Sequence, residues 1–346
     1  MYSAIKHEKK LPGGTCNIGD MVQTVAALQF LPKLDYYFNR RQSPDIVDNS
    51  LQLPKSFAIM NSWYGVGLLP APNKITPFYI SIHINQPEML TPKVVAHLQK
   101  HQPIGARDRN TLALLESHGI DSYYSGCLTL SFPQSNLPRS GKVYIVDIDD
   151  RGLKLIPDEL KKKAIYINYK TYKNWQDTIK VQKGNILRPL VGKSERLREF
   201  LEVPKVFLNS EFRSFFPRIW TDNEFNNLLH MFKARTLLNM YRQADLVITS
   251  RLHCAAPSLA FGTPVVFLAR RKHQDGDVRF EAVGRYIPLN MDASSSEDIN
   301  WHPQPVNIEN HRRFLRMISQ KAVEMGKNPL QEIPLTRFYE DSGWNG

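Results

Sequence analysis

The sequence predicts an α/β protein built of two Rossmann-like domains that face a cleft. Short hydrophobic stretches alternate with amphipathic ones along most of the chain, which is typical of parallel sheets with helical crossovers. Residues 131–141 (SFPQSNLPRSG), rich in Pro and Ser, separate two such series. The chain has 346 residues, more than one hydrophobic core usually holds. We therefore expect domains at 1–138 and 139–307, with a C-terminal helix and tail at 308–346 that could pack back on the N-terminal domain.

The N-terminal half contains the first predicted strand–helix series. Its strands are short apolar runs, at 57–61, 78–84, 104–107 and 122–130. Its helices carry an apolar residue every three or four positions, at 20–31, 92–100 and 110–117. Thr91 and Pro92 predict the start of the second helix, and Gly119 follows the end of the third. Residues 2–11 (YSAIKHEKKL) are poorly hydrophobic, so a first strand, or a shortened start, is left open.

The C-terminal half repeats the alternation. Strands are predicted at 142–147, 164–168, 245–249 and 264–269. Helices are predicted at 223–242, 252–261 and 308–325. Residues 169–221 are aromatic and basic and show no clear period.

Charge and cysteine content limit the possible partners. Lys and Arg number 45 against 33 Asp and Glu, a net charge of +12 that favours anionic partners such as phosphates or acidic glycans. No nucleic-acid-binding module is recognisable, so nucleic acid is not an expected partner. No apolar run reaches the roughly 20 residues of a membrane span, although peripheral membrane contact stays open. Three widely spaced cysteines and a basic N-terminus without a signal-peptide pattern favour the cytoplasm.

The segment with the strongest chemical signal covers residues 245–268 (DLVITSRLHCAAPSLAFGTPVVFL). A buried strand is followed almost at once by a helix, and Arg251 and His253 fall at that strand end. Ligands of parallel α/β sheets bind there, and the helix N-terminus favours an anion. Arg provides a planar fork for carboxylate or phosphate, and His exchanges protons near neutral pH. The alternative is that Arg251 caps a surface loop and His253 is a hydrogen-bonded core residue.

A second segment, residues 104–119 (IGARDRNTLALLESHG), places Arg107 at the end of a short strand. We expect Asn110 or Thr111 to cap the helix that follows. Arg107 could supply a second guanidinium on the opposite wall of the cleft. The alternative is a surface cluster of ion pairs made by residues 107–109, which would contribute little to stability.

Further candidates are single residues near predicted turns. Asn17 and Asp20 stand at a turn that leads into a helix, where Asp20 is a plausible N-cap. His83 lies in a predicted strand. A histidine in such a position is more often a hydrogen-bonded residue of the sheet than a catalyst. Arg279 could contact an anion or form an ion pair. Asp147, with its neighbours at 149 and 150, could hold a metal, but a solvated turn is favoured and no metal site is predicted.

Six segments, in order, resemble the polysaccharide pyruvyl transferase family. The resemblance spans about residues 15–286 and begins with the Asn-x-Gly-Asp turn at Asn17. It continues through MNSWYG, PFYISIHI, PIGARDRNTLALLESHGI, SGCLTLSF and ADLVITSRLHCAAPSLAFGTPVVF. The Arg-Leu-His part is the most specific. Ser62 and Ala106 depart from the family's common Gly and Cys, but neither change removes a functional group used here.

The resemblance implies a GT-B-like fold and transfer of a pyruvyl group from phosphoenolpyruvate to sugar hydroxyls in polysaccharide or glycoconjugate biosynthesis. It implies no cofactor and no metal, with phosphoenolpyruvate as co-substrate and a saccharide as acceptor, free, polymeric or lipid-linked. Arg251 and His253 match the catalytic element, with Arg251 also in contact with the donor. Arg107 matches a donor contact, and the match of Arg279 and Asp20 is weaker.

Two other functions are compatible with the sequence. A nucleotide-sugar glycosyltransferase of the same architecture would need a carboxylate late in the second domain, for which Glu281 is the candidate. A catalytically inactive, glycan-binding relative would keep the fold and lose turnover.

Overall fold

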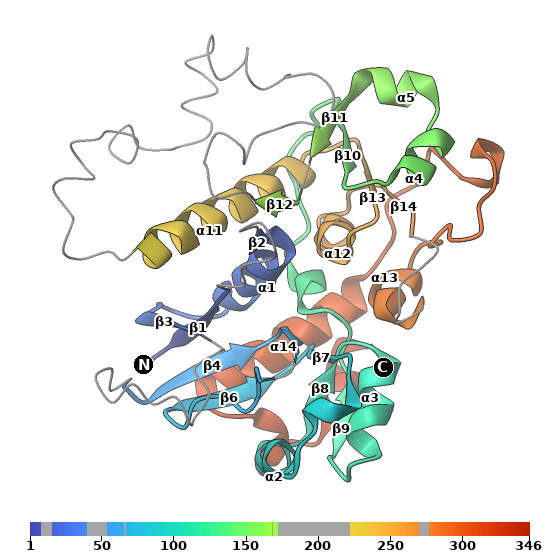
Figure 1. Cartoon of the computed structure of the whole chain (residues 1–346). Helices are drawn as coiled ribbons and strands as arrows, with labels where there is room; N and C mark the ends of the chain where they lie inside the picture. Colours follow the sequence, from blue (N-terminus) through green and yellow to red (C-terminus); the bar gives the residue numbers. More distant parts are fainter. Residues whose placement is uncertain (8–15, 40–53, 66, 168, 172–221, 270–276) are drawn as a thin grey trace, which may run out of the picture.

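The computed structural model describes residues 1–7, 16–39, 54–65, 67–167, 169–171, 222–269 and 277–346. It shows a mixed α/β fold with parallel sheets, as predicted (Figure 1). Nearly all of the stretch 169–221 lies outside the described residues.

The N-terminal region contains parallel strands, which are β1 (Ser3–Lys6), β3 (Tyr36–Asn39), β4 (Ser56–Met60), β6 (Ile75–Tyr79), β8 (Ile104–Ala106) and β9 (Ser122–Tyr124). Single parallel bridges, Tyr2–Phe57 and Ile82–Ala106, join the strand pairs in the order β3-β1-β4-β6-β8-β9. Two short strands, β5 (Trp63–Tyr64) and β7 (His83–Ile84), pair in parallel beside them. The first strand therefore exists: Ala4 and Ile5 are buried in it although its surroundings are polar.

The C-terminal region contains a four-stranded parallel sheet in the order β11-β10-β13-β14. Its strands are β10 (Val143–Val146), β11 (Ala164–Ile167), β13 (Leu246–Thr249) and β14 (Val265–Phe267). In both regions the first strand lies between the second and the third, so β1 and β10 each stand at a topological switch point. Ligands of open α/β sheets bind outside the carboxyl ends of strands at such points.

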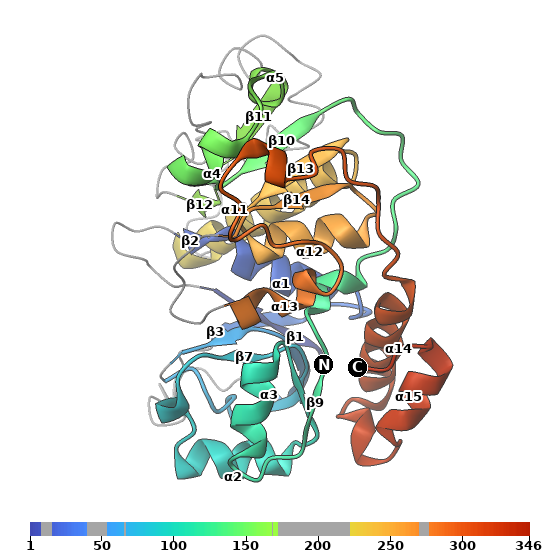
Figure 2. The same ribbon diagram turned by 90° about the vertical axis from the view of Figure 1, so that its right-hand side faces the viewer.

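Helices cover these sheets and connect them (Figures 1 and 2). They are α1 (Ile18–Leu28), α2 (Pro92–Lys100), α3 (Arg109–Glu116), α4 (Asp150–Leu155), α5 (Asp158–Lys163), α11 (Asp222–Tyr241), α12 (Leu252–Ala260), α13 (Glu281–Gly284), α14 (Glu309–Met325) and α15 (Leu335–Ser342). Short 3-10 turns are η1 (Pro87–Met89), η2 (Leu128–Ser131), η3 (Asp277–Phe280), η4 (Ser296–Asp298) and η5 (Pro329–Gln331). None of the helices in the described ranges is both long and apolar enough to cross a membrane.

Helix α1 joins the two regions. In both views it lies between the N-terminal strands and the C-terminal sheet (Figures 1 and 2), and it packs against α11 and α12. One hydrophobic core runs from Ile59 and Phe78 of the N-terminal strands, through Met21 of α1, to Val247 and Leu252. Burial of this continuous apolar surface holds the strand ends of both regions near each other.

The C-terminal helices return to the N-terminal region (Figure 2). The ring of Phe314 in α14 packs edge-to-face on Tyr123 of β9, with centroids 6.2 Å apart. Asn328 Nδ2 donates to the carbonyl oxygens of His101 and Pro103, at 3.0 Å each. The end of the chain therefore covers the β8–β9 side of the N-terminal strands.

Two predicted strands were wrong in extent. The run 78–84 is interrupted because Ser81 takes φ of 57°, so β6 ends at Tyr79 and a separate strand begins at His83. The run 122–130 is a strand only to Tyr124, since Gly126 takes φ of 64° and η2 follows. In both cases a backbone in the left-handed region ends the pleat.

Candidate active site

Arg251 is the N-cap residue of α12, one residue beyond Ser250, which follows the end of β13. Its backbone N–H donates to Thr249 Oγ1 (3.0 Å), which bends the chain from strand to helix. Its Nε donates to Asp147 Oδ2 at 2.8 Å. Asp147 follows β10, so this ion pair spans the carboxyl ends of β10 and β13 at the switch point of the C-terminal sheet.

The carboxylate of Asp147 is used within the protein. Its Oδ1 accepts the backbone N–H of Tyr169 (3.2 Å), while its backbone takes φ of 50°. Asp149 caps α4 by accepting the N–H of Gly152 (2.9 Å). These contacts agree with the favoured interpretation of this segment as a turn. No group of three or more His, Cys, Asp or Glu suited to a metal occurs among the described residues.

His253 stands in the first turn of α12, and its backbone is anchored from outside the helix. Pro257 lies four residues further on and has no N–H to donate to the His253 carbonyl. The hydroxyl of Tyr169 donates to that carbonyl instead, at 2.8 Å. Tyr169 in turn accepts the backbone N–H of Ile18 at its own carbonyl (3.2 Å). A buried tyrosine thus ties the first turn of α12 to the first turn of α1.

The start of α1 lies directly against the imidazole of His253. A Cβ atom added to Gly19 would come within 2.9 Å of His253 Nδ1, so only glycine leaves room for the ring here. Asn17 caps α1 by accepting the N–H of Gly19 (3.1 Å). The prediction that Asp20 is the cap was wrong, because Asn17 holds the cap position and Asp20 is buried within the first turn of the helix.

Arg107 and Asp108 follow β8 and are buried, with exposures of 3% and 1%. The Nε of Arg107 has no hydrogen-bond partner in the described part of the chain, and its nearest carboxylate oxygen, on Asp108, is 3.9 Å away. A buried guanidinium with so little compensation is energetically costly without an anion. The alternative of a surface ion-pair cluster is therefore wrong for these two residues.

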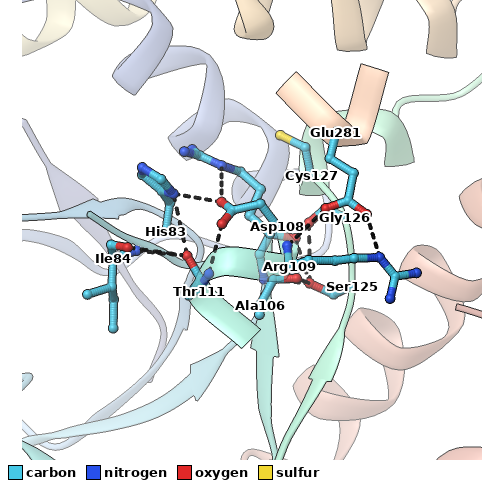
Figure 3. Close-up of polar contacts among 12 residues, drawn as sticks. His83, Ile84, Ala106, Asp108, Arg109, Thr111, Ser125, Gly126, Cys127 and Glu281 are labelled. Atoms are coloured by element: carbon cyan, nitrogen blue, oxygen red, sulfur yellow. Dashed lines mark hydrogen bonds and ion pairs between the residues drawn. The ribbon is translucent and has the colours of Figure 1, made fainter. Parts of the chain in front are cut away.

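Asp108 connects two elements (Figure 3). Its Oδ1 accepts the N–H of Thr111 (2.9 Å) and so caps α3, where Asn110 or Thr111 had been predicted as cap. Its Oδ2 accepts from His83 Nδ1 at 2.6 Å. Burial would raise the pKa of Asp108, but the hydrogen bond from His83 and the charge of Arg107 outweigh it, so this pKa lies below its usual value.

Arg109, the next residue, binds a carboxylate of the C-terminal region. Its backbone N–H and its Nε donate to the two carboxylate oxygens of Glu281, each at 2.9 Å (Figure 3). The side chain of Arg109 remains 62% exposed. This pair links α3 of the N-terminal region to α13 of the C-terminal region beside the site.

The two imidazoles and the arginines form one electrostatic neighbourhood, which we call the cationic cluster: His83, Arg107, Arg251, His253 and Arg279. Burial, followed by the charges of Arg107 and Arg279, holds the pKa of His253 well below its usual value, with smaller contributions from His83 and Arg251. Burial and the charge of Arg107 also lower the pKa of His83. The Nε2 atom of His253 is covered and has no hydrogen-bond partner among the described residues.

The structure thus brings together five residues that the sequence singled out, from both regions of the chain. Asn17 caps the helix whose Gly19 lies against His253, and Asp20 is buried in the first turn of that helix. Asp108 and Tyr169 were missed. A carboxylate two residues before the first turn of a predicted helix was a usable signal for Asp108, but no local pattern marks Tyr169 as a partner of residue 253.

Comparison with known proteins agrees with the resemblance noted in the sequence. The family model described as polysaccharide pyruvyl transferase matches residues 17–272. None of the curated proteins matches the chain significantly. Because the family match covers well over half of the chain and includes the strand ends that carry Arg107, Arg251 and His253, the chain belongs to the polysaccharide pyruvyl transferase family.

Proposed function

We propose that this member of the family transfers a pyruvyl group from phosphoenolpyruvate to the hydroxyls of a sugar and closes a cyclic ketal. One observation carries the proposal. The buried guanidinium of Arg107 and the imidazole of His253 share the cationic cluster, and each has a covered nitrogen without a hydrogen-bond partner among the described residues. Such groups are stabilised by an anion that supplies the missing acceptors.

Phosphoenolpyruvate carries a carboxylate and a phosphate, which suits guanidinium groups at separate positions. Arg107 and Arg251 would each hold one of these groups, and Arg279 would add positive charge. The first backbone N–H groups of α12 would face the same anion, because a helix N-terminus carries a partial positive charge of about +0.5. Preorganised positive charge of this kind also stabilises the leaving phosphate in the transition state.

His253 would handle the proton on the donor side. Two negative groups bound beside it would offset the nearby cations and raise its pKa, so that the imidazole takes up a proton. It would then protonate the methylene carbon, C3, which makes C2 electrophilic. A sugar oxygen bonds to C2, phosphate leaves with the electrons of its C2–O bond, and a second hydroxyl closes the ketal. The hydroxyls release two protons, of which one replaces the proton given to C3 and the other leaves with phosphate.

The two regions of the chain would share the site. The cluster takes His83 and Arg107 from the N-terminal region and Arg251, His253 and Arg279 from the C-terminal region, which supports a GT-B-like arrangement with the site between them. We propose that the donor is bound mainly by the C-terminal region and the saccharide by the N-terminal region. The reaction needs no cofactor or metal, and it would take place in the cytoplasm on a free, polymeric or lipid-linked acceptor.

The test uses the full chain with phosphoenolpyruvate and a set of repeat-unit oligosaccharides. We expect phosphate release together with the mass gain of a pyruvyl ketal on one of them. His253→Ala should lower both by about 10² to 10⁴, the usual contribution of a positioned acid or base. The matched control is His302→Ala, which changes an exposed histidine and should leave the rate unaltered. Phosphate and ketal formation at the wild-type rate in His253→Ala would contradict the assignment of His253.

The glycosyltransferase alternative depends on Glu281 as a nucleotide-sugar contact. In the structure both oxygens of this carboxylate accept from Arg109. A sugar nucleotide would have to displace that pair, so this alternative is disfavoured. Thermal shifts with phosphoenolpyruvate, UDP-sugars and GDP-sugars separate the two functions, since we expect stabilisation by phosphoenolpyruvate alone. Binding without turnover on any acceptor would favour the inactive, glycan-binding alternative.

A further inference from the structure

His83 is held in a defined orientation by a buried carboxylate (Figure 3). Asp108 Oδ2 lies 2.6 Å from His83 Nδ1, and a carboxylate of lowered pKa can only accept. The ring proton of a neutral His83 is therefore on Nδ1, and the lone pair is on Nε2. Nε2 makes no hydrogen bond within the described residues, and it is not among the fully covered polar atoms. The ring thus keeps one nitrogen for a partner outside the protein.

The backbone places this ring at the carboxyl end of the N-terminal strands. After β6 the chain turns at Ser81, whose positive φ of 57° is costly for a residue other than glycine. The His83 N–H then donates to the Ser62 carbonyl (3.0 Å), and the Arg107 N–H donates to the Ile82 carbonyl (2.8 Å). These bonds fix His83 beside Arg107, at the sheet edge where α/β proteins bind ligands.

The charged groups that act on His83 come from two segments. Arg107 and Asp108 belong to the β8–α3 connection, and Arg279 belongs to η3. His83 in turn lowers the pKa of His253 in α12. Burial and Arg107 lower the pKa of His83, whereas the hydrogen bond and charge of Asp108 raise it. The largest causes of the lowered pKa of His253 are burial and neighbouring Arg and His side chains, with no carboxylate among them. The two imidazoles therefore share cations but differ in their carboxylate partner, a pattern that separates acid and base roles.

We propose that His83 is the general base that deprotonates the acceptor hydroxyl, and that Asp108 is its positioning residue. This inference rests on the proposed function and assigns the second proton transfer in it. The acceptor O–H gives its proton to Nε2 while its oxygen bonds to C2 of the donor. That proton then leaves with the phosphate, and the proton of the second hydroxyl restores His253. Asp108 stabilises the resulting imidazolium, as the aspartate of a hydrolase triad does. The same imidazole cannot give a proton to C3 and take one from the hydroxyl in a single step, so His253 and His83 divide the two tasks.

Asp108→Asn is the sharpest variant, because Asn caps a helix as well as Asp and α3 should remain intact. We expect phosphoenolpyruvate binding, measured by calorimetry, to stay within about threefold, while ketal formation at pH 7 falls by about 10² to 10⁴. The acidic limb of kcat/KM for the acceptor should move to lower pH, since Asp108 raises the pKa of His83. Imidazole nitrogen shifts in NMR should show the Nδ1–H tautomer of His83 in the wild type and lose it in the variant.

The matched control is Asp149→Asn, the same change at the carboxylate that caps α4. It should leave the rate and the pH profile unaltered. A second variant, His83→Ala, should bind phosphoenolpyruvate, lose turnover and regain part of it with added imidazole, which a purely structural histidine would not show.

The outcomes separate the two proposals. A wild-type rate and an unshifted acidic limb in Asp108→Asn, with His253→Ala inactive, would overturn the dyad and leave the proposed function standing. A wild-type chain that neither binds phosphoenolpyruvate nor forms product would overturn the proposed function, and the dyad with it. An Nε2–H tautomer of His83 in the wild-type spectrum would contradict the dyad whatever the rates.

Discussion

Two histidines, His311 and His253, differ in whether the protein satisfies both ring nitrogens, although burial of the ring lowers the pKa of both. In the C-terminal aromatic cage, formed by Tyr286, His311, Phe314 and Trp344, the His311 ring stacks on Trp344 at 4.0 Å. Its Nε2 donates to the Ser125 carbonyl and its Nδ1 accepts from the Tyr286 hydroxyl, both at 2.8 Å.

In the cationic cluster, by contrast, Nε2 of His253 has no partner among the described residues, and the charges of three arginines lower the pKa of the ring. Burial lowers the pKa of His311 to about 4 and is also the largest cause of the low pKa of His253. A lowered pKa therefore does not distinguish a structural histidine from a functional one. What differs is whether both ring nitrogens are satisfied by the protein.

The largest effect on stability is expected at His311. His311→Ala removes two hydrogen bonds and the ring that stacks on Trp344, so the free energy of unfolding should fall by about 3 kcal/mol. Urea denaturation measures it, with exposed His302→Ala as a control that should change it by less than about 0.5 kcal/mol. Phosphate release per folded molecule should stay at the wild-type level. If His311→Ala kept its stability but lost turnover, the contrast between the two histidines would fail.

Arg107→Met should raise the stability of the protein and weaken its binding of phosphoenolpyruvate. The variant replaces a buried, poorly compensated charge by an apolar chain of similar length, so the free energy of unfolding should rise by about 1 to 2 kcal/mol. Affinity for phosphoenolpyruvate should fall by about 30-fold, the loss of one charged hydrogen-bond partner of about 2 kcal/mol. Arg109→Met, at an exposed guanidinium, is the control for affinity. Lower stability in Arg107→Met would show that the guanidinium is already compensated within the protein.

Stability should depend on pH through both histidines. A folded-state pKa below the unfolded value of about 6.5 means that the unfolded chain binds more protons, so stability is greatest above pH 6.5 and falls as the pH decreases. Each such imidazole contributes a slope of about 1.4 kcal/mol per pH unit between about pH 6.5 and its folded pKa. Urea titrations from pH 7.5 to 4.5 should show a smaller slope for His253→Gln and for His311→Gln.

Bound phosphoenolpyruvate should act on only one of these two histidines. Its charge should raise the pKa of His253 and leave that of His311 unaltered, so the ligand should flatten only the His253 contribution. If phosphoenolpyruvate changed the slope of stability against pH equally in His253→Gln and in the wild type, the anion would bind away from His253.

The smallest effect is expected at Gly19. Gly19→Ala introduces a Cβ atom 2.9 Å from His253 Nδ1, and the ring must shift to accommodate it. Turnover should fall by about tenfold through misplacement of the imidazole, while helix propensity raises stability by at most about 1 kcal/mol. In a His253→Ala background the same change should cost no further activity, because the displaced ring is absent. Equal losses in both backgrounds would mean that Gly19 acts on another group.

The strand ends that hold the candidate site residues could be predicted from the sequence, because a short apolar run followed by a helix fixes where the last residues of the run lie. Arg107, Arg251 and His253 were placed on that basis. Membership of the family could likewise be predicted from short segments of the sequence. The breaks within strands were not predictable, because Ser81 adopts its positive φ only through long-range contacts, such as the bond from its N–H to Ser125 Oγ (3.0 Å).

Contacts between side chains distant in sequence could not be predicted either. Asp108 stands between two arginines, which favours a local ion pair, yet its main partner is His83, 25 positions earlier. Glu281 meets Arg109 across 172 positions. Such pairs depend on how the two regions pack, which hydrophobic spacing does not specify. Asp20 was misjudged for a simpler reason: Asn17, three residues earlier, is an equally good cap and occupies the position first.

The proline in α12 has a mechanical consequence. In an ordinary helix the carbonyl of residue 253 would be satisfied by its own helix, and the imidazole would follow that helix alone. Here the carbonyl is bound by Tyr169, whose neighbours Lys170 and Thr171 form β12, which pairs antiparallel with β2 (Cys16–Asn17) just before α1. The first turn of α12 is thus supported by two segments distant in sequence, and a displacement of β12 would reach the His253 carbonyl through a single phenolic hydroxyl.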